Sequence, residues 1–400
     1  MHILYVTQGY KPAYRIGGPI GAASAAAEGM AARGHRVTVF TTNNNLDEDL
    51  DVPVDQPVLV DGVEVWYFRH QDLMRRYLWW SKYLSQSSGF LYAPALAASI
   101  RKLLPSVDIV HTQMPFIYPT MIAGRLAISA GKPLFYSQHG VFHPSRLEYR
   151  ALKKRLYIEL VEKPIMRRAS GLIALTPDEI DSYCALGIKT RSFVVPNGVD
   201  VAEFRRQPHT QLLSTLGIGQ SDQVILFLGR LHPAKGADLL LDAFVRVASK
   251  HPKSVLVIAG PDEYGFAREF RDKAARQNIE SRIRIPGMVT GELKLDLLAR
   301  ADLFVLPSIG EGLSVAILEA LASGTPVILS PECNLPIVGE LKAGAIVPRD
   351  VNLLAQAISR FLCDPELRCA ASEAAFALAR DKFAWPSIIG KLESIYLDAI

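Results

Sequence analysis

The sequence has little of what marks several specialised classes of protein. Four cysteines occur in 400 residues, with no CxxC pair and no histidine at metal-ligand spacing, so neither a zinc site nor a disulfide framework is indicated. The net charge of +4 is too small for a nucleic-acid-binding protein unless it is concentrated locally. The charge-free stretch 83–100 is interrupted by polar residues and Pro94, which argues against a transmembrane helix. We therefore expect a cytoplasmic protein with reduced thiols.

Short apolar runs alternate with helical segments along the whole chain. This alternation is typical of βαβ units, in which helices cover a parallel sheet. The pattern loosens around 200–220 and resumes with an expected strand at Val224–Leu228. We therefore predict an α/β fold with one domain at 1–200, a second at 201–382 and a C-terminal helix within 383–400, whose first turn contains Pro386.

Two glycines precede the first expected helix. The expected strand Ile3–Thr7 leads into a loop that ends in Gly17 and Gly18, and an alanine-rich helix begins near Ile20. Glycine lets the backbone approach a ligand, and the free N–H groups of a helix start favour an anion such as a diphosphate. The alternative is a structural turn, because Gly-Gly turns before helices are common.

Two cations follow the first expected strand of the second domain. Arg230 and Lys235 lie within the segment 229–236, at the end of a strand where ligands bind in open α/β sheets. A guanidinium and an ammonium at this edge can hold a pyrophosphate and stabilise its charge as it leaves. The alternative is a solvated turn.

Two glutamates flank the start of an expected helix after the strand Leu303–Leu306. At about 100° per residue, Glu311 and Glu319 would not share a helix face, so we place Glu311 in the loop. Glu319 falls in an otherwise apolar helix and needs polar partners. Sugar hydroxyls can satisfy both carboxylates. The alternative is a capping glutamate and a buried glutamate paired with an arginine.

Taken together, these motifs resemble glycosyltransferase family 4. The resemblance rests on Gly17-Gly18, on Val195-Pro196-Asn197-Gly198-Val199-Asp200, on Gly-Arg-x4-Lys-Gly at 229–236 and on Glu-x7-Glu at 311–319, in the expected order along nearly the whole chain. It implies a GT-B fold, in which two Rossmann-like domains with parallel sheets face one another and the C-terminal helix packs back toward the first. It also implies a retaining sugar transfer.

The resemblance implies a role for individual residues as well. Glu319 would bind the ribose of the donor, Glu311 would bind the hydroxyls of the transferred sugar, and Met288 and Val289 would present backbone to the nucleotide base. The residues that would hold or stabilise the diphosphate are Gly17, Gly18, Arg230, Lys235, Gly312, Leu313 and Ser314.

His139 follows the expected strand Leu134–Ser137 and matches the family's histidine near the sugar and the scissile bond. The alternative is a hydrogen-bonded surface imidazole. The segment His111-Thr112-Gln113 departs from family members that carry a second histidine or an acid at its third position. We therefore assign no role to His111 or Gln113.

The implied reaction is ionisation of the donor with retention. An oxocarbenium-like sugar is attacked from the face that the diphosphate leaves, without an enzyme nucleophile, and positive charge stabilises the departing group. The acidic run Asp47–Asp51 has Asp-x-Asp spacing, which marks a metal site in another glycosyltransferase fold, but it lies in a local acidic loop. We expect no essential metal and no cofactor beyond a GDP- or UDP-linked sugar as co-substrate.

Positive charge is concentrated in one part of the first domain. Residues 146–168 carry a local excess of five positive charges, and residues 75–83 interleave cations with aromatic rings, a composition suited to a headgroup interface. Because the family's first domain usually receives the acceptor, we expect a glycan or polyprenyl-linked acceptor and peripheral binding at the anionic inner face of the plasma membrane. The alternative is a solvated basic helix.

Other functions are less consistent with the sequence than sugar transfer is. A nucleotide-sugar epimerase or a phosphorylase can share the fold, but Glu-x7-Glu argues against both. A non-catalytic partner subunit with this fold is disfavoured because the charged residues of the motifs and His139 are retained. Nucleic-acid binding lacks a recognisable module. We therefore predict a hexosyltransferase of bacterial polysaccharide or glycolipid assembly.

Overall fold

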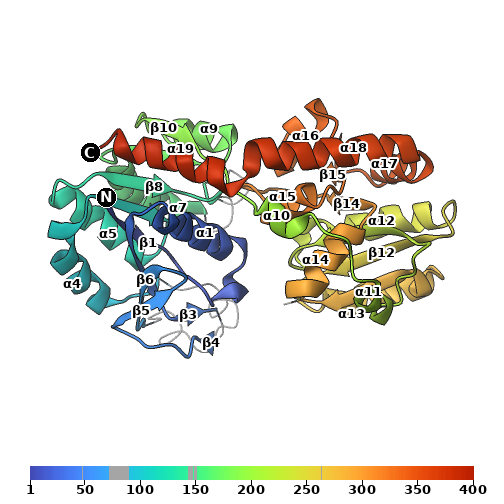
Figure 1. Ribbon diagram of the computed structural model, residues 1–400, viewed down its shortest axis with the longest axis horizontal. Coiled ribbons are helices and arrows are strands. Elements are labelled where there is room, and N and C mark those ends of the chain that lie inside the picture. Colours follow the sequence, from blue (N-terminus) through green and yellow to red (C-terminus); the bar gives the residue numbers. More distant parts are fainter. Residues whose placement is uncertain (47, 72–89, 143–146, 148–150, 263) are drawn as a thin grey trace. The chain divides into compact units, whose positions relative to one another are not determined.

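The computed structural model divides the chain into two compact units, whose elements are labelled in Figure 1. It describes residues 1–46, 48–71, 90–142, 147, 151–262 and 264–400. Unit 1 comprises Met1–Asn197 and Trp385–Ile400, and unit 2 comprises Gly198–Ala384. The sequence analysis placed the corresponding boundaries at 200/201 and 382/383. Within the described ranges, no helix combines the length and the apolar character that crossing a bilayer requires.

The described part of unit 1 contains an eight-stranded sheet in the order β10-β9-β8-β7-β1-β2-β6-β5. All neighbouring strands are parallel except β5 and β6. A small hairpin of β3 (Asn44–Asn45) and β4 (Glu48–Asp49) is separate from it. The strands of the main sheet are β1 (His2–Val6), β2 (Arg36–Thr42), β5 (Pro57–Val60), β6 (Val63–Phe68), β7 (Ile109–Gln113), β8 (Leu134–Ser137), β9 (Gly171–Ala174) and β10 (Ser192–Val194).

The antiparallel edge strand β5 departs from the expectation of a wholly parallel sheet. Asp61 and Gly62 join it to β6, and their φ angles are 46° and 81°. Two left-handed residues between paired strands form the type I′ turn that Asp-Gly favours in hairpins. The dipeptide between two valine-rich runs is the sequence signal for this hairpin.

Helices cover both faces of the unit 1 sheet. One face packs against α4, α5, α8 and α9 around Phe40, Leu134 and Met166, and the other packs against α1 and α19 around Tyr5 and Tyr396. The helical segments are α1 (Gly18–Ala32), α4 (Pro94–Leu103), α5 (Tyr118–Ser129), α7 (Ala151–Tyr157), α8 (Lys163–Met166), α9 (Pro177–Ala185), α19 (Trp385–Leu397), the 3₁₀ turns η1 (Tyr14–Ile16) and η2 (Leu104–Ser106), and the π-helical turn η3 (Ile158–Glu162).

The C-terminal helix α19 packs into unit 1, which confirms that part of the predicted fold. Ile389 lies so close to Gly29 of α1 that a Cβ on Gly29 would be 2.7 Å from Ile389 Cγ1. The Tyr396 hydroxyl lies 3.1 Å from the Tyr5 hydroxyl and is hydrogen-bonded to Nδ1 of His111. The end of the chain therefore completes the core of the unit in which the chain begins.

In the described part of unit 2, six parallel strands form a sheet in the order β13-β12-β11-β14-β15-β16. This is the 3-2-1-4-5-6 order of the Rossmann fold. Two of these strands were expected from the sequence at Val224–Leu228 and Leu303–Leu306; the first begins one residue earlier in the structure, and the second has the expected bounds. The strands are β11 (Gln223–Leu228), β12 (Ser254–Ala259), β13 (Ile283–Gly287), β14 (Leu303–Leu306), β15 (Val327–Leu329) and β16 (Gly344–Ile346).

The helices of unit 2 pack on this sheet and on one another. The apolar residues Leu240, Phe244 and Val247 recur at helical spacing in α12, which packs against α17. The helical segments are α10 (Val201–Phe204), α11 (Thr210–Thr215), α12 (Ala237–Ala248), α13 (Phe266–Arg276), α14 (Gly291–Arg300), α15 (Val315–Ala322), α16 (Ile337–Glu340), α17 (Val351–Cys363), α18 (Pro365–Leu378), the 3₁₀ turns η4 (Pro233–Lys235), η5 (Glu280–Arg282) and η6 (Pro331–Cys333), and the π-helical turn η7 (Ala379–Phe383).

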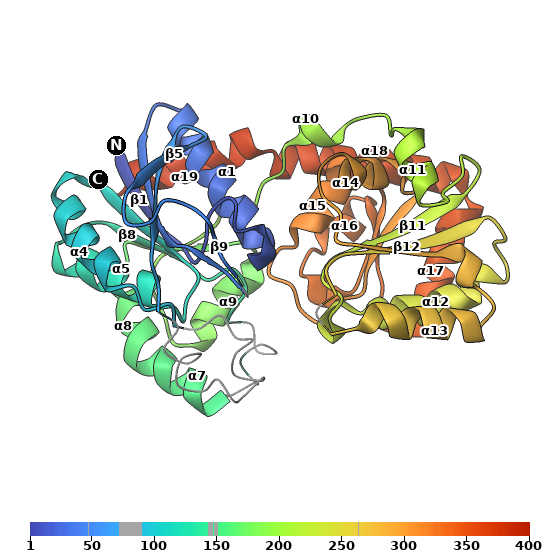
Figure 2. The ribbon, with the colours of Figure 1, turned by 90° about the horizontal axis from the view of Figure 1, so that it is seen from below.

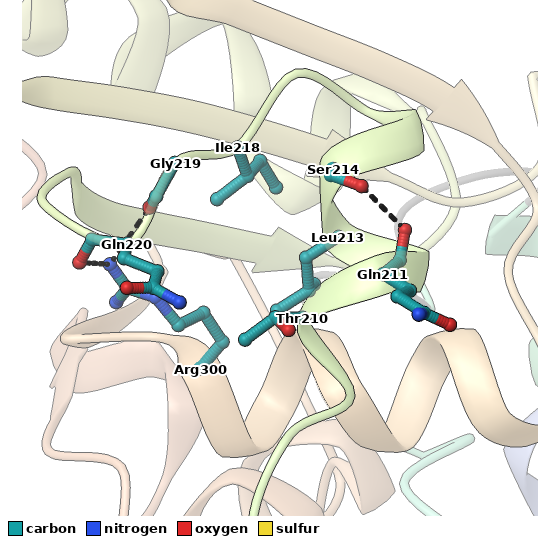
Figure 3. Close-up of a pocket in the computed structure, with 8 residues that line it drawn as sticks. All are labelled: Thr210, Gln211, Leu213, Ser214, Ile218, Gly219, Gln220 and Arg300. Carbon is teal, nitrogen blue, oxygen red and sulfur yellow. Dashed lines mark hydrogen bonds between the residues drawn. The ribbon is translucent and has the colours of Figure 1, made fainter.

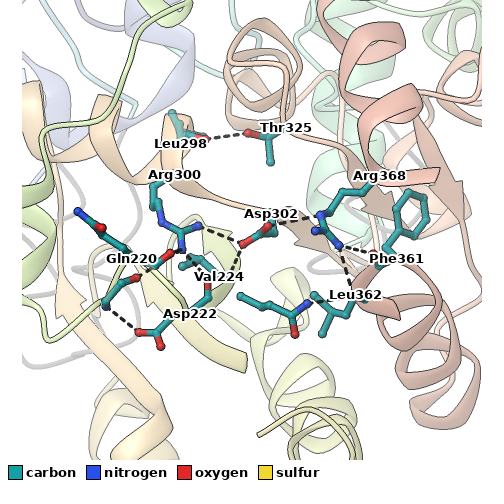
Figure 4. A network of polar contacts seen from close by, with 12 residues as sticks. Gln220, Asp222, Val224, Leu298, Arg300, Asp302, Thr325, Phe361, Leu362 and Arg368 are labelled. Carbon is teal, nitrogen blue, oxygen red and sulfur yellow. Dashed lines mark hydrogen bonds and ion pairs between the residues drawn. The ribbon is translucent and has the colours of Figure 1, made fainter. Parts of the chain in front are cut away.

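A polar network at the amino ends of β11 and β14 ties the sheet of unit 2 to α17 and α18 (Figure 4). Asp302 accepts hydrogen bonds from the Val224 amide at 2.8 Å and from Arg300 Nη1 at 3.1 Å. The Nε atom of Arg368 lies 3.4 Å from Asp302 Oδ1, the other oxygen of this carboxylate. The Nη1 atom of Arg368 donates a hydrogen bond to the Phe361 carbonyl at 2.8 Å. The network therefore fixes the sheet at the edge opposite to its carboxyl ends.

We expect His111 to make unit 1 sensitive to acid. Burial, with a smaller contribution from nearby His139, lowers the pKa of His111 from 6.5 to about 3. Because the folded state binds this proton less readily than the unfolded state, stability is lost as the pH falls below about 6.5. The thermal unfolding midpoint should therefore fall less steeply between about pH 6.5 and 4.5 in His111→Gln than in the wild type.

Circular dichroism melting at a series of pH values measures this difference. Tyr396→Phe is the control, because it removes the hydroxyl that is bonded to His111 Nδ1 and leaves the buried histidine in place. The control should keep the wild-type pH dependence. Parallel curves for His111→Gln and the wild type would show that His111 does not carry the effect.

Candidate functional site

The unit 2 sheet has a switch point between β11 and β14. The strands β12 and β13 follow on one side of β11, and β15 and β16 follow on the other side of β14. In open parallel sheets, ligands bind at such a point, outside the carboxyl ends of the strands. The loop after β11 contains Arg230 and Lys235, and the loop after β14 contains Glu311. The topology therefore brings two motifs of the sequence to one edge.

Glycines hold the backbone segments of this edge close together. A Cβ on Gly236, which has a φ of +72°, would lie 2.2 Å from the carbonyl oxygen of Pro307. A Cβ on Gly260 would lie 1.9 Å from the oxygen of Gly229, and the Gly260 amide donates to the Gly287 carbonyl at 2.8 Å. A side chain at either position would force these segments apart.

Lys235 and Glu311 form an ion pair at the switch point. The Nζ atom of Lys235 lies 2.6 Å from Oε1 and 2.8 Å from Oε2 of Glu311. Glu311 is only 5% exposed, so water hardly reaches its carboxylate, and the ammonium of Lys235 compensates for the lost hydration. Glu311 lies in the loop before α15, where the sequence analysis placed it. Two residues to which separate roles were assigned therefore bind one another.

Backbone contacts fix the loop that carries Glu311. The Glu311 amide donates to the Glu332 carbonyl at 3.0 Å, and Asn334 Nδ2 donates to the Glu311 carbonyl at 3.0 Å. Nearer to β14, the Ile309 amide donates to the Ala234 carbonyl at 2.8 Å. The loop is thus tied both to η6 and to η4, which carries Lys235, and the ion pair is held from both sides.

Arg230 is exposed, and it lies in the same loop after β11 that leads to Lys235. Its side chain makes no hydrogen bond or ion pair with the described residues, and it can meet an anion. Met288 and Val289 follow β13 at the same edge. Met288 is 52% exposed and Val289 is buried, so a ligand at this edge meets Met288.

Glu319 is buried in α15 and is paired with Lys294 of α14. The Nζ atom of Lys294 lies 2.7 Å from Glu319 Oε1. Burial raises the pKa of Glu319, and the ammonium of Lys294 opposes that rise. The sequence analysis expected polar partners for Glu319 and named arginine as the protein alternative. It missed Lys294, because nothing in the sequence separates this lysine from solvated ones on an amphipathic helix.

The amino end of α15 follows Glu311 directly. Gly312 and Leu313 lead to Ser314, the N-cap residue, whose side chain makes no capping hydrogen bond with the described residues. The first amides of a helix have no intrahelical acceptor, and the helix dipole makes this end positive. The end of α15 therefore suits an anion that approaches the Lys235–Glu311 pair.

The two glycines of unit 1 lie after β1, at the switch point of that unit's own sheet. Gly17 has a φ of +103° and no described atom within 4 Å of an added Cβ. Gly18 begins α1, two residues before the expected start near Ile20, and Pro19 occupies its first turn. The helix start is therefore open to a ligand at the carboxyl end of β1, beside β7.

Gln113 ends β7, and His139 lies two residues beyond the end of the neighbouring strand β8, at the same edge of unit 1. His139 has a left-handed φ of 52°, and burial lowers its pKa to about 4, so its imidazole is neutral at pH 7. Its Nε2 atom and the Oε1 atom of Gln113 are both buried without a partner in the described part of the chain. The alternative of a hydrogen-bonded surface imidazole does not describe this Nε2. Unpartnered buried atoms are costly and point to a polar ligand.

Gln113 is a candidate that the sequence analysis set aside. No spacing rule singles it out, and its position at the end of β7, next to the switch point, is its one sequence signal. His111 is different, because its Nε2 lies 2.7 Å from Ser137 Oγ and its Nδ1 is bonded to Tyr396. His111 therefore belongs to the core.

Parts of three predicted segments lie outside the described residues. These are the whole of 75–83, residues 146 and 148–150 of the basic segment, and Asp47 of the acidic run. Glu48 and Asp49 form the exposed strand β4, and Arg15 lies 3.2 Å from Glu48.

A hollow elsewhere in unit 2 has no comparable chemistry (Figure 3). Its charged residue, Arg300, donates to the carbonyls of Gly219 and Gln220 and to Asp302, so its guanidinium is occupied. The lining residues are Thr210, Gln211, Leu213, Ser214, Ile218, Gly219, Gln220 and Arg300.

Family models match both units. The model described as Glycosyltransferase Family 4 matches residues 22–203, and the model described as Glycosyl transferases group 1 matches residues 222–364. Together they span most of the chain and include all the residues of the unit 2 site.

Two curated relatives are similar over nearly the whole chain. The alpha-monoglucosyldiacylglycerol synthase of Streptococcus pneumoniae is 25% identical over 388 residues, which are 93% of this chain and 80% of that protein. The D-inositol 3-phosphate glycosyltransferase of Saccharomonospora viridis is 27% identical over 391 residues, which are 93% of this chain and 86% of that protein.

Solved structures confirm the predicted GT-B fold. The sucrose-phosphate synthase of Thermosynechococcus elongatus matches with a TM-score of 0.76 at 20% identity. The match covers 100% of this chain and 99% of the synthase chain. The HepE protein of Anabaena, crystallised with UDP-glucose, has a TM-score of 0.74 at 20% identity and full coverage of both chains.

We expect the Lys294–Glu319 pair to behave as a coupled unit. Lys294→Met or Glu319→Gln should each lower the free energy of unfolding by about 1–3 kcal/mol, because each leaves one polar group without its partner. The double variant should lose less than the sum of the two. Urea denaturation of the four proteins measures the coupling.

The matched control is the pair of Asp242 and Lys273 in the same unit, whose charged atoms are 2.6 Å apart and whose carboxylate side chain is 44% exposed, against 12% for Glu319. Asp242→Asn should change stability by less than about 1 kcal/mol. Strictly additive losses for Lys294 and Glu319 would show that the pair does not stabilise the fold.

Proposed function

Since the chain belongs to glycosyltransferase family 4, we propose that it transfers a hexose, with retention, from a nucleotide diphosphate sugar to a glycan or lipid-linked acceptor. The observation that carries this proposal is the Lys235–Glu311 ion pair at the switch point of unit 2, with the exposed Arg230 in the same loop as Lys235. It offers positive charge for a diphosphate and a carboxylate for hydroxyl groups at one place.

The diphosphate is assigned to the positive groups of this edge. Arg230 carries a guanidinium without a protein partner among the described residues, and Lys235 can share its ammonium between Glu311 and a phosphate. The amides at the start of α15, from Gly312 to Ser314, add the positive end of a helix dipole. These groups stabilise the charge that develops as the diphosphate leaves.

The rest of the donor is assigned to neighbouring groups. Glu311 accepts hydrogen bonds from the hydroxyls of the transferred sugar, and Glu319 accepts them from the ribose. Met288 and Val289 offer backbone to the nucleotide base. UDP is the first nucleotide to test, because HepE, a protein of the same fold, was crystallised with UDP-glucose. GDP is the second nucleotide to test.

Unit 1 contributes uncharged groups in this proposal. Gly17 and Gly18 let the start of α1 approach the phosphates, and the neutral imidazole of His139 faces the sugar and the scissile bond. The C–O bond to the diphosphate breaks first, and the acceptor hydroxyl then attacks the oxocarbenium-like sugar from the same face and passes its proton to the departing diphosphate oxygen. The scheme uses no enzyme nucleophile and no metal, because Arg230 and Lys235 neutralise the leaving group.

The proposed acceptor is a glycan or lipid that takes part in polysaccharide or glycolipid assembly at the inner face of a bacterial membrane. The basic segment 146–168 supports an anionic surface as a partner. Of the two relatives, one is named as a synthase of a glycosylated diacylglycerol, which is a lipid, and the other is named as a glycosyltransferase of D-inositol 3-phosphate, which is not. A soluble glycan acceptor remains compatible with the same donor site.

Binding of the nucleotide is the most direct test. UDP or GDP should raise the thermal unfolding midpoint of the purified protein, because a ligand that binds only the folded state stabilises it. Lys235→Ala should lower turnover by about 100-fold or more in slow hydrolysis of a radiolabelled donor without acceptor. If a folded protein gains no stability from UDP, GDP or ADP, the donor assignment fails.

Two carboxylate variants separate the ribose from the transferred sugar. Glu319→Ala should weaken nucleotide affinity, whereas Glu311→Ala should leave most of that affinity and mainly lower the rate of transfer. Calorimetry with the nucleotide and a turnover assay with the sugar donor measure the two effects. Equal losses of nucleotide affinity in both variants would contradict the assignment.

A further inference from the structure

Three leucines lie exposed in a row along α7 and η3. Leu152, Leu156 and Leu160 are 84%, 59% and 64% exposed. Successive members are four residues apart in the sequence, and such residues are neighbours on one face of a helix. Single exposed leucines are ordinary, but a contiguous apolar row on a soluble unit marks a contact surface.

The other side of the same segment is anchored in the core of unit 1. Ile158 and Glu162 are each 1% exposed. The Glu162 carboxylate accepts hydrogen bonds from the Phe116 amide and from the Tyr136 hydroxyl, both at 2.8 Å. The segment therefore cannot turn to bury its leucines without breaking these bonds. Figure 2 shows α7 at the periphery of unit 1, following the same edge as α8.

Cations flank the leucine row. At about 100° per residue, Lys153 lies on one side of Leu152 and Arg155 lies about 60° away on the other. Both cations are exposed. The acidic residue on this side, Glu159, forms an ion pair with Lys163, so its charge does not cancel theirs. The surface thus combines an apolar strip with positive edges.

We propose that the leucine row inserts into the headgroup boundary of a bilayer that contains anionic lipids, with Lys153 and Arg155 against the lipid phosphates. Apolar side chains bordered by basic ones are the composition of helices that lie in a membrane interface. This inference rests on the membrane location proposed above and adds to it an apolar contact. Charge alone gives attraction that salt abolishes, whereas buried leucines add a contact that resists salt.

A second copy of the chain fits this surface less well. A twofold contact would place the same patch on both sides of the interface. Lys153 and Arg155 of one copy would then approach the same residues of the other, and like charges oppose association. An anionic surface removes this conflict, so lipid is the occupant to which the geometry points.

The test is co-sedimentation with vesicles of equal parts phosphatidylglycerol and phosphatidylcholine. The wild type should bind at low salt and keep part of its affinity at about 1 M salt, where the Debye length is about 3 Å. The variant Leu152→Ser/Leu156→Ser/Leu160→Ser should lose at least tenfold in affinity at high salt. The variant Lys153→Ser/Arg155→Ser should lose affinity mainly at low salt.

The matched control is Leu59→Ser in the same unit. Leu59 is 76% exposed, and it lies on the edge strand β5 rather than in the row. Its substitution should leave vesicle binding unchanged. The thermal unfolding midpoint of every variant, and its shift with UDP in the absence of vesicles, show that the protein is folded and test the donor site separately. Leu156→Glu provides a second, single disruption of the row.

Three results would overturn the proposal. The wild-type protein could stay in the supernatant at low salt, or the leucine variant could bind as tightly as the wild type at high salt. The wild type could also elute as a dimer that the leucine variant dissociates, without vesicle binding by either, and the row would then be a contact between copies. A normal UDP shift in any of these cases leaves the proposed transfer reaction intact.

Discussion

The ion pair between Lys235 and Glu311 is the interaction on which the unit 2 site depends. The carboxylate of Glu311 is almost fully withdrawn from water, and such a charge needs a partner. The fold supplies that partner by closing the loops after β11 and β14 onto one another at Gly236 and Pro307. In the proposed reaction, a nucleotide sugar exchanges with the pair, its phosphate meeting the ammonium and its hydroxyls meeting the carboxylate. On that proposal, neither charge is left unpaired before or after binding.

The candidate groups of unit 1 are neutral where those of unit 2 are charged. Burial keeps His139 uncharged at pH 7, and Gln113 ends the neighbouring strand with an unpartnered amide oxygen. Such atoms suit hydroxyl groups, which both donate and accept hydrogen bonds. The amino end of α1 adds a partial positive charge without an ionised side chain. This division agrees with a charged donor held by unit 2 and a polyhydroxylated group at the edge of unit 1.

Much of this arrangement could be predicted from the sequence, because parallel α/β sheets place the loops after their strands at one edge. Arg230, Lys235 and Glu311 each follow an apolar run, and that alone assigns them to the same edge of unit 2. The pairing partners could not be predicted in the same way. The lysine that holds Glu319 lies on another helix, and no spacing rule connects residues on different elements. The alternating pattern predicted the α/β class, and the GT-B fold itself was implied by the family resemblance alone.

The leucine row shows why a charge pattern is an incomplete guide to a surface. From the sequence, residues 146–168 were interpreted through their basic side chains alone, as a membrane-binding segment or a solvated basic helix. The segment carries two apolar rows. One contains Ile158 and Ile165 and is buried, and the other contains Leu152 and Leu156 and is exposed. Periodicity places residues on a face, but only packing against the sheet decides which face is covered. The surface that remains is therefore both basic and apolar, which neither the charge nor the periodicity indicates alone.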